Sequence, residues 1–260
     1  MMRFVDVTVT YRTPERTVEA LRGVSLDLKP GLVTGLVGES GSGKSTMLYA
    51  ALRLLPPQAD SSGAILADGV NLLELKQHEM NRYRWKYVSY VPQGAMNSLT
   101  PVLTVGSQID ETLRRHLDIS APEARKRRNA LLEKVKLDRL FANRYPHELS
   151  GGQKQRVSIA MAIACGPRFI LADEPTTALD VITQAEVISL LAELVREQGS
   201  GLLLVTHDLA LASSVSDRLA VLHRGLLAEE GKPAEILAHP VHEHTRALVR
   251  ALGRTGGVKR

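Results

Sequence analysis

The segment from Gly38 to Ser45 constrains the fold of this chain more than any other part of its sequence. It reads Gly-Glu-Ser-Gly-Ser-Gly-Lys-Ser, which matches the pattern G-x-x-x-x-G-K-[ST]. In this pattern glycines turn the backbone so that successive N–H groups point at phosphate oxygens. The apolar run 32–37 before it predicts a buried strand, and the run 46–55 after it predicts a helix whose N-terminal dipole favours an anion. The chain is therefore expected to bind a nucleoside triphosphate.

This loop supplies the first set of candidate site residues. Lys44 is expected to reach the β- and γ-phosphates, and the Ser45 hydroxyl is expected to ligate Mg²⁺. The candidate nucleotide-binding residues here are Gly38, Glu39, Ser40, Gly41, Ser42, Gly43, Lys44, Ser45 and Thr46.

Composition narrows the class of protein without naming a partner. The chain has 260 residues, 44% hydrophobic and 23% charged, which is ordinary for a globular protein. Its single cysteine excludes an internal disulfide and any four-cysteine metal site. No segment predicts a signal peptide or a membrane span, so a membrane role is expected to come through a partner.

The net charge of +5 selects no anionic partner by itself. The densest basic runs are 82–86, which leads into an expected strand at 87–91, and 125–128, which falls in a helical pattern. The first run is interpreted as an amphipathic lead-in to that strand and the second as a solvated helix face, and no nucleic-acid partner is expected.

Strand and helix patterns alternate along the chain, which predicts an α/β fold with a largely parallel sheet. A β-rich N-terminal region surrounds the phosphate loop, a helical and charged stretch follows it, and the alternation then returns up to a short C-terminal helical region. Strands are expected at 3–11, 24–28, 64–67, 169–173, 201–206 and 219–224, and helical segments at 106–141, 154–164 and 182–197.

Two carboxylates follow the expected strand 169–173. A buried strand that ends in acid places Asp173 where it can hold Mg²⁺ through water. Glu174 is the next residue and is positioned to polarise an attacking water as a general base. These two residues are the candidate metal ligand and the candidate catalytic base.

The segment Leu149-Ser-Gly-Gly-Gln153 is the second decisive motif. Ser150 is expected to cap the following helix, and the two glycines are expected to leave the amides of its first turn open to an anion. The phosphate loop together with this segment closely resembles the signature of the ATP-binding-cassette (ABC) superfamily, over most of the chain from Tyr11 to about Gly231.

The resemblance implies roles for further residues. Tyr11 stands where the family has an aromatic side chain that stacks on adenine. Gln93 matches the glutamine that senses Mg²⁺ and the attacking water. His207 matches the histidine that contacts the γ-phosphate and supports Glu174, and Asp180 ends a loop that crosses a dimer interface.

In the family, ATP lies between the phosphate loop of one subunit and the Ser-Gly-Gly-Gln segment of another. The resemblance therefore implies ATP and Mg²⁺ as cofactors and places Ser150, Gly151, Gly152 and Gln153 in the nucleotide site. It also implies one ABC domain over 1–260. Within it, 1–93 and 150–230 form the nucleotide-binding core, 94–149 a helical subdomain and 231–260 a short helical tail.

The segment from Gln93 to Val105 resembles the branch of ATPases that drive oligopeptide, dipeptide and nickel importers, as does 240–248. This branch implies transmembrane permease partners, an indirect link to an extracytoplasmic solute-binding protein, and a place at the cytoplasmic face of the membrane. It also implies a second ABC ATPase, for which a paralogue is favoured over a second copy. Many peptide-importer ATPases carry a C-terminal cysteine cluster, whereas this chain has only Cys165, so the solute stays open between peptides and nickel or a related small solute.

Two alternatives to an importer remain open. One is a subunit of the carbon–phosphorus lyase machinery, whose ATPase-like proteins resemble the same branch. The other is an ABC ATPase of DNA repair or translation; an exporter is disfavoured. Finally, His239, His242, Glu243 and His244 invite a metal-site hypothesis, but their loose spacing favours the start of a surface helix.

Overall fold

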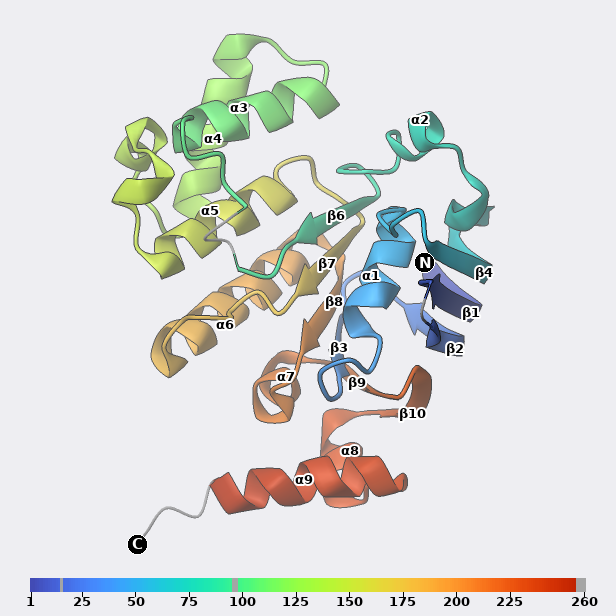
Figure 1. The fold of residues 1–260 in the computed structure, drawn as a ribbon. Coiled ribbons are helices and arrows are strands. Elements are labelled where there is room, and N and C mark those ends of the chain that lie inside the picture. The colour runs from blue at the N-terminus through green and yellow to red at the C-terminus, as the bar shows by residue number, and fades with distance from the viewer. Residues whose placement is uncertain (15, 95–97, 256–260) are drawn as a thin grey trace, which may run out of the picture. The chain divides into compact units, whose positions relative to one another are not determined.

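The structure is a computed structural model that describes residues 1–14, 16–94 and 98–255, without side-chain detail for 253–255. It divides into two compact units (Figure 1). The first unit combines Met1–Asn81 with the chain from Gly201 onward, and the second unit is Arg82–Ser200.

The first unit contains an antiparallel sheet with the strand order β2-β1-β4-β5. Residues of β1 alternate between buried and exposed positions, as expected for a strand with one face on a core. Strand β2 is longer than the expected 24–28, because its pairing with β1 continues until Arg12 faces Thr17. The strands are β1 (Met2–Arg12), β2 (Thr17–Leu28), β4 (Ala59–Ala67) and β5 (Val70–Asn71).

Four further strands of the first unit lie side by side in the order β10-β9-β3-β8. β3 is parallel to β8 and to β9, and β10 is antiparallel to β9. β3 and β8 are buried along their whole length, which explains why both are apolar runs rather than alternating patterns. The strands are β3 (Val33–Val37), β8 (Gly201–Thr206), β9 (Arg218–His223) and β10 (Leu226–Gly231).

The C-terminal region of the first unit differs from the short helices expected there. β10 was not predicted, and α9 is 13 residues long rather than short. Leu248, Val249 and Leu252 of α9 pack against a core formed by β3, β9, α7 and α8, so tertiary contact stabilises this helix. The helices are α1 (Lys44–Leu52), η1 (Leu72–Glu74), α2 (Gln77–Met80), α7 (Leu209–Val215), α8 (Pro233–Ala238) and α9 (Glu243–Thr255).

The second unit pairs β6 (Val88–Val91) with β7 (Phe169–Asp173) in parallel. The helical stretch expected at 106–141 is two α-helices followed by a 3₁₀ turn, with Ser120 as the N-cap of the second helix. The helical elements are α3 (Val105–His116), α4 (Ala121–Lys134), η2 (Arg139–Asn143), η3 (Pro146–Glu148), α5 (Gly151–Ile163) and α6 (Val181–Gln198).

The basic run 125–128 is not wholly a solvated face. Arg128 is half-buried and its guanidinium lies 2.7 Å from Asp110 of α3. This ion pair joins α3 to α4.

No helix among the described residues is long and apolar enough to cross a lipid bilayer.

Candidate nucleotide site

The phosphate loop lies where β3 ends and α1 begins. Gly43, with φ of 107°, is the N-cap of α1, and within the described chain no side chain caps this helix. A helix start without a side-chain cap suits an anion, in line with the predicted role of the loop.

The side chain of Lys44 folds back onto the loop itself. Its ammonium donates hydrogen bonds of 2.8 Å to the backbone oxygens of Gly38 and Glu39. Lys44 is only 6% exposed, so these carbonyls hold a buried positive charge inside the loop. The Oγ of Ser42 is also buried and has no hydrogen-bond partner among the described residues. A buried cation beside an unsatisfied hydroxyl fits a phosphate group.

Close packing explains two of the glycines of the loop. A Cβ on Gly38 would lie 2.2 Å from the backbone oxygen of Leu222, and one on Gly43 would lie 2.4 Å from that of Ala20. Gly41, with φ of 77°, has no neighbour within 4 Å of such a Cβ, so its constraint is the backbone conformation alone.

Two other candidate residues belong to the same unit as the loop. The Tyr11 hydroxyl lies 3.2 Å from Thr46 Oγ1, so the predicted adenine-stacking residue contacts the helix that follows the loop. His207 directly follows Thr206, and Thr206 is paired with Val37 in the parallel register. Because parallel strands end at the same edge, His207 and the phosphate loop emerge at one edge of the sheet.

The candidate catalytic carboxylates lie at the end of β7 in the second unit. Asp173 is 1% exposed and accepts a long hydrogen bond of 3.4 Å from Tyr90. Val91 of β6 is paired with Ala172, so Gln93 and Glu174 lie abreast, each two residues further on. The amide of Gln93 accordingly donates to Glu174 Oε2 at 3.2 Å.

Glu174 adopts a left-handed φ of 39°, which is uncommon for a residue with a Cβ. Thr177 holds this turn by donating to the backbone oxygen of Glu174 at 3.1 Å and to Oε2 at 3.3 Å. A strained residue held by its neighbours is a feature of functional sites.

The Ser-Gly-Gly-Gln segment forms the first turn of α5. Ser150 caps this helix as predicted, but the helix begins at Gly151 instead of at Lys154. The amide of Gln153 donates to Ser150 Oγ at 3.3 Å, and Gln153 Oε1 accepts from the Ser150 amide at 2.9 Å. The expectation that the two glycines leave the helix amides open is therefore wrong for Gln153, because the reciprocal capping box engages its amide.

Asp180 begins the long helix α6. Its carboxylate accepts from the Thr183 amide at 3.0 Å and from the Thr183 hydroxyl at 2.7 Å. The side-chain hydrogen bond from Thr183 lowers the pKa of Asp180. A Cβ on Gly152 would lie 2.8 Å from Cγ2 of Thr183, so the start of α5 packs closely on the start of α6.

The helix start expected at the C-terminal histidines is confirmed, because α9 begins at Glu243, but the expected surface position is wrong for His244. This residue is buried, and its ring stacks on His223 with 3.9 Å between the ring centroids. His223 was not among the predicted site residues, because nothing in its local sequence connects the end of β9 to α9. The segment 95–97 of the predicted importer-like motif lies outside the described residues.

The fold and the site define a phosphate-loop ATPase. The sequence profile of the ABC transporter family matches residues 21–177, which include both the phosphate loop and the Ser-Gly-Gly-Gln segment. This chain belongs to the ABC transporter family.

Curated relatives match almost the entire chain. The oligopeptide transport ATP-binding protein OppD of Escherichia coli (strain K12) is 38% identical over 98% of this chain and 76% of that protein. OppD of Bacillus subtilis (strain 168) is 40% identical over 97% of this chain and 72% of that protein. The dipeptide transport ATP-binding protein DppD of Caldanaerobacter subterraneus is 39% identical over 97% of this chain and 78% of that protein.

Solved structures carry the same fold. The dimeric, post-hydrolysis ATP-binding cassette MJ0796 bound to ADP and Pi has a TM-score of 0.80 at 36% identity, covering 90% of this chain and 99% of its own. CbiO1 from Clostridium perfringens, part of the complex cbiONQ, has a TM-score of 0.78 at 27% identity, covering 98% and 96%.

Proposed function

We propose that this chain is the ATP-hydrolysing subunit that drives a peptide importer of the ABC class. The observation that carries the proposal is the match of nearly its whole length to oligopeptide and dipeptide transport ATP-binding proteins. The carbon–phosphorus lyase and DNA-repair alternatives find no counterpart in these names. Other subunits of the importer decide which peptide is transported, and whether nickel or another small solute is transported in its place.

Three site residues of the first unit are proposed to contact ATP. In this proposal, Lys44 leaves the carbonyls of Gly38 and Glu39 and binds the β- and γ-phosphates. Tyr11 stacks on adenine, and His207 contacts the γ-phosphate. Each of these residues belongs to the first unit.

We further propose that Asp173 and Ser45 hold Mg²⁺ when it is bound, because this ion prefers oxygen ligands. Asp173 offers a buried carboxylate at the end of β7, and Ser45 offers a hydroxyl. When bound, the ion would neutralise charge on the phosphates. Glu174 takes a proton from the attacking water, and the hydrogen bond from Gln93 to Oε2 keeps this carboxylate in place.

A second ABC ATPase completes the proposed site. Its Ser150, Gly151, Gly152 and Gln153 equivalents would contact the phosphates, and its Asp180 equivalent would line the interface. The post-hydrolysis cassette to which this chain is similar is described as dimeric. A paralogue is the favoured second subunit.

The permease is expected to dock on the helical region 94–149, which we propose to be a subdomain distinct from the nucleotide-binding core (1–93 and 150–230) and from the tail (231–260). Val102 is 77% exposed and Leu103 is 38% exposed, and both lie within the importer-like segment Gln93–Val105. Such exposed apolar side chains are candidates for contact with another protein. Docking would place this chain at the cytoplasmic face of the membrane, with the solute-binding protein reached only through the permease.

A pull-down in mild detergent from native cells, followed by mass spectrometry, tests this function. We expect two multi-span permeases, with a second ABC ATPase. Recovery of soluble phosphonate enzymes, ribosomes or DNA in their place would overturn the transport function and leave the ATPase.

A matched pair of variants tests the docking surface. Val102→Lys is expected to lower permease recovery at least about tenfold, because a charge replaces an apolar contact. Val241→Lys is the control, since Val241 is 75% exposed but lies in the first unit. Equal recovery with the two variants would exclude Val102 from the interface.

A further inference from the structure

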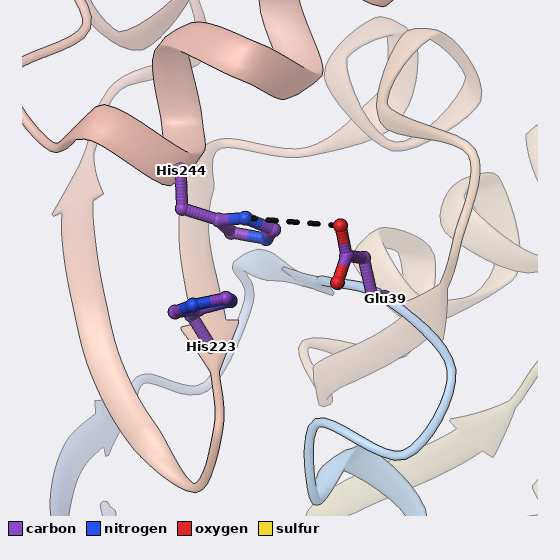
Figure 2. Close-up of side chains that lie close together, drawn as sticks. All are labelled: Glu39, His223 and His244. Carbon is purple, nitrogen blue, oxygen red and sulfur yellow. Dashed lines mark ion pairs between the residues drawn. The ribbon is translucent and has the colours of Figure 1, made fainter.

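Two histidines that no catalytic role uses gather with Glu39, a candidate nucleotide-binding residue, in the first unit. Glu39 belongs to the phosphate loop, His223 ends β9, and His244 lies in the first turn of α9 (Figure 2). Their potential ligand atoms all lie within 4.8 Å of one another.

The sheet register explains why Glu39 and His223 meet. Val37 of β3 is paired with Val221 of β9 in parallel. Glu39 and His223 each follow two residues later, so they leave the same edge of the sheet abreast of each other.

Helix α9 carries the third group to this edge. Its apolar face packs on the core through Leu248, Val249 and Leu252. Before it, the amides of Val241 and His242 each donate a 3.0 Å hydrogen bond to the Glu229 carboxylate on β10. The position of His244 is thus fixed from both sides.

His244 is a buried polar side chain that lacks an adequate partner. It is 9% exposed, and its Nε2 has no hydrogen-bond partner within the described part of the chain. Its Nδ1 lies 3.9 Å from Glu39 Oε1, which is too long for a hydrogen bond. Buried polar atoms are normally satisfied, so this one requires an explanation such as an ion.

Coordination of one ion requires side-chain rotation. The rings of His223 and His244 are stacked, 28° from parallel, so the half-buried His223 side chain must turn before a nitrogen of each ring points at the same ion. The Glu39 carboxylate lies beside the His244 ring (Figure 2). The Glu39 side chain is 66% exposed and can swing inward, whereas the buried imidazole cannot. Burial lowers the pKa of His244, which favours the neutral imidazole that a metal ion requires.

We propose that Glu39, His223 and His244 bind a transition-metal dication of the Zn²⁺ type through two imidazole nitrogens and one carboxylate oxygen. Water would complete the coordination. This ion is distinct from nucleotide-bound Mg²⁺, because imidazole suits zinc and its neighbours while magnesium prefers oxygen. The bound ion would tie the C-terminal helix to the phosphate loop.

Isothermal titration calorimetry of the full chain with ZnCl₂, free of nucleotide and Mg²⁺, tests the site. We expect one Zn²⁺ per chain, and binding that persists in excess Mg²⁺. His223→Gln and His244→Gln should each weaken binding at least about tenfold. His78→Gln, an exposed histidine of α2, is the matched control and should leave binding unchanged.

Two further measurements guard against misfolding and against a different site. Circular dichroism checks that each variant is folded. Glu39→Gln changes an exposed side chain, so it keeps the test decisive if His244→Gln unfolds. X-ray absorption of the zinc-loaded protein should give nitrogen and oxygen ligands without sulfur. Absence of stoichiometric binding, displacement by Mg²⁺, a sulfur ligand, or undiminished binding in folded His223→Gln and Glu39→Gln would each overturn the proposal.

Discussion

The starts of two helices, α1 in the first unit and α5 in the second, are built in opposite ways for the same kind of ligand. At α1 a glycine stands at the N-cap, and no described side chain caps the helix. At α5 Ser150 and Gln153 cap the helix reciprocally. The first helix start therefore carries no side-chain cap, whereas the second uses the Gln153 amide in a cap of its own.

The difference extends to charge. The loop before α1 holds the buried ammonium of Lys44 on its own carbonyls, while the first turn of α5 has neither an acidic nor a buried basic residue. We infer that the phosphate loop binds nucleotide by itself and that the α5 segment contributes only when a second subunit presents ATP to it. Four experiments test this difference between the two helix starts.

The largest effect is expected for Glu174→Gln. Removal of the general base should lower turnover by about 10²- to 10⁴-fold and leave ATP binding intact. Steady-state ATPase assays measure the first quantity, and size exclusion with ATP should reveal a trapped dimer. Glu193→Gln, on an exposed position of α6, serves as control. Full turnover in Glu174→Gln would remove this residue from its role.

Lys44→Ala should remove the buried positive charge that distinguishes the start of α1 from the start of α5. Loss of a charged hydrogen-bond donor to the phosphates should weaken ATP binding by about 100- to 1,000-fold in the isolated chain. Titration with a fluorescent ATP analogue gives the affinity. Lys29→Ala, at an exposed position before β3, should bind as the wild type does; a similar affinity for both variants would contradict the role of the phosphate loop.

The reactivity of Cys165 measures how accessible the C-terminal end of α5 is, because this cysteine lies just after the helix. Burial raises the pKa of its thiol from 9.0 to about 11. Since only the thiolate reacts, labelling at pH 8 should be about 100-fold slower than for a free cysteine, and it should accelerate as pH rises toward that pKa. This is the single cysteine of the chain, so one thiol-specific reagent suffices. Rapid labelling at pH 8 would show that the region opens readily.

Ser150→Ala should have the smallest effect of the four experiments. It separates the role of Ser150 as a helix cap from its role in ATP hydrolysis. Loss of the N-cap should cost about 1 kcal/mol of unfolding free energy, and turnover should fall about tenfold because the partner's phosphates lose a donor. ATP binding to the single chain should be unchanged.

Ser120→Ala is the matched control, since Ser120 also caps a helix, α4, by accepting from the amide three residues on. It should lose similar stability in thermal denaturation but keep full turnover. Equal turnover in the two variants would mean that the α5 segment is only a helix cap.

Much of the site could be predicted because its signals are local. The glycines of the phosphate loop, the apolar run ending at Asp173 and the Ser150 cap each act within a few residues of chain. The family resemblance assigned both Gln93 and Glu174 to the attacking water but did not predict their contact, for which the parallel register of β6 and β7 supplies the physical cause.

Other features could not be predicted, since they depend on distant partners. The N-terminal half of β2 has no strong strand pattern of its own and extends because β1 offers a pairing edge. β10 exists through its pairing with β9, and the length of α9 comes from its packing on the core.

The amino-acid pattern alone identifies the class of this protein, because the residues of a phosphate loop and of a signature helix define their geometry within a short stretch of chain. The meeting of Glu39, His223 and His244 becomes visible only in the folded chain. Their approach requires the register of β3 with β9 and the docking of α9 on the core, which are set by long-range burial and hydrogen bonding.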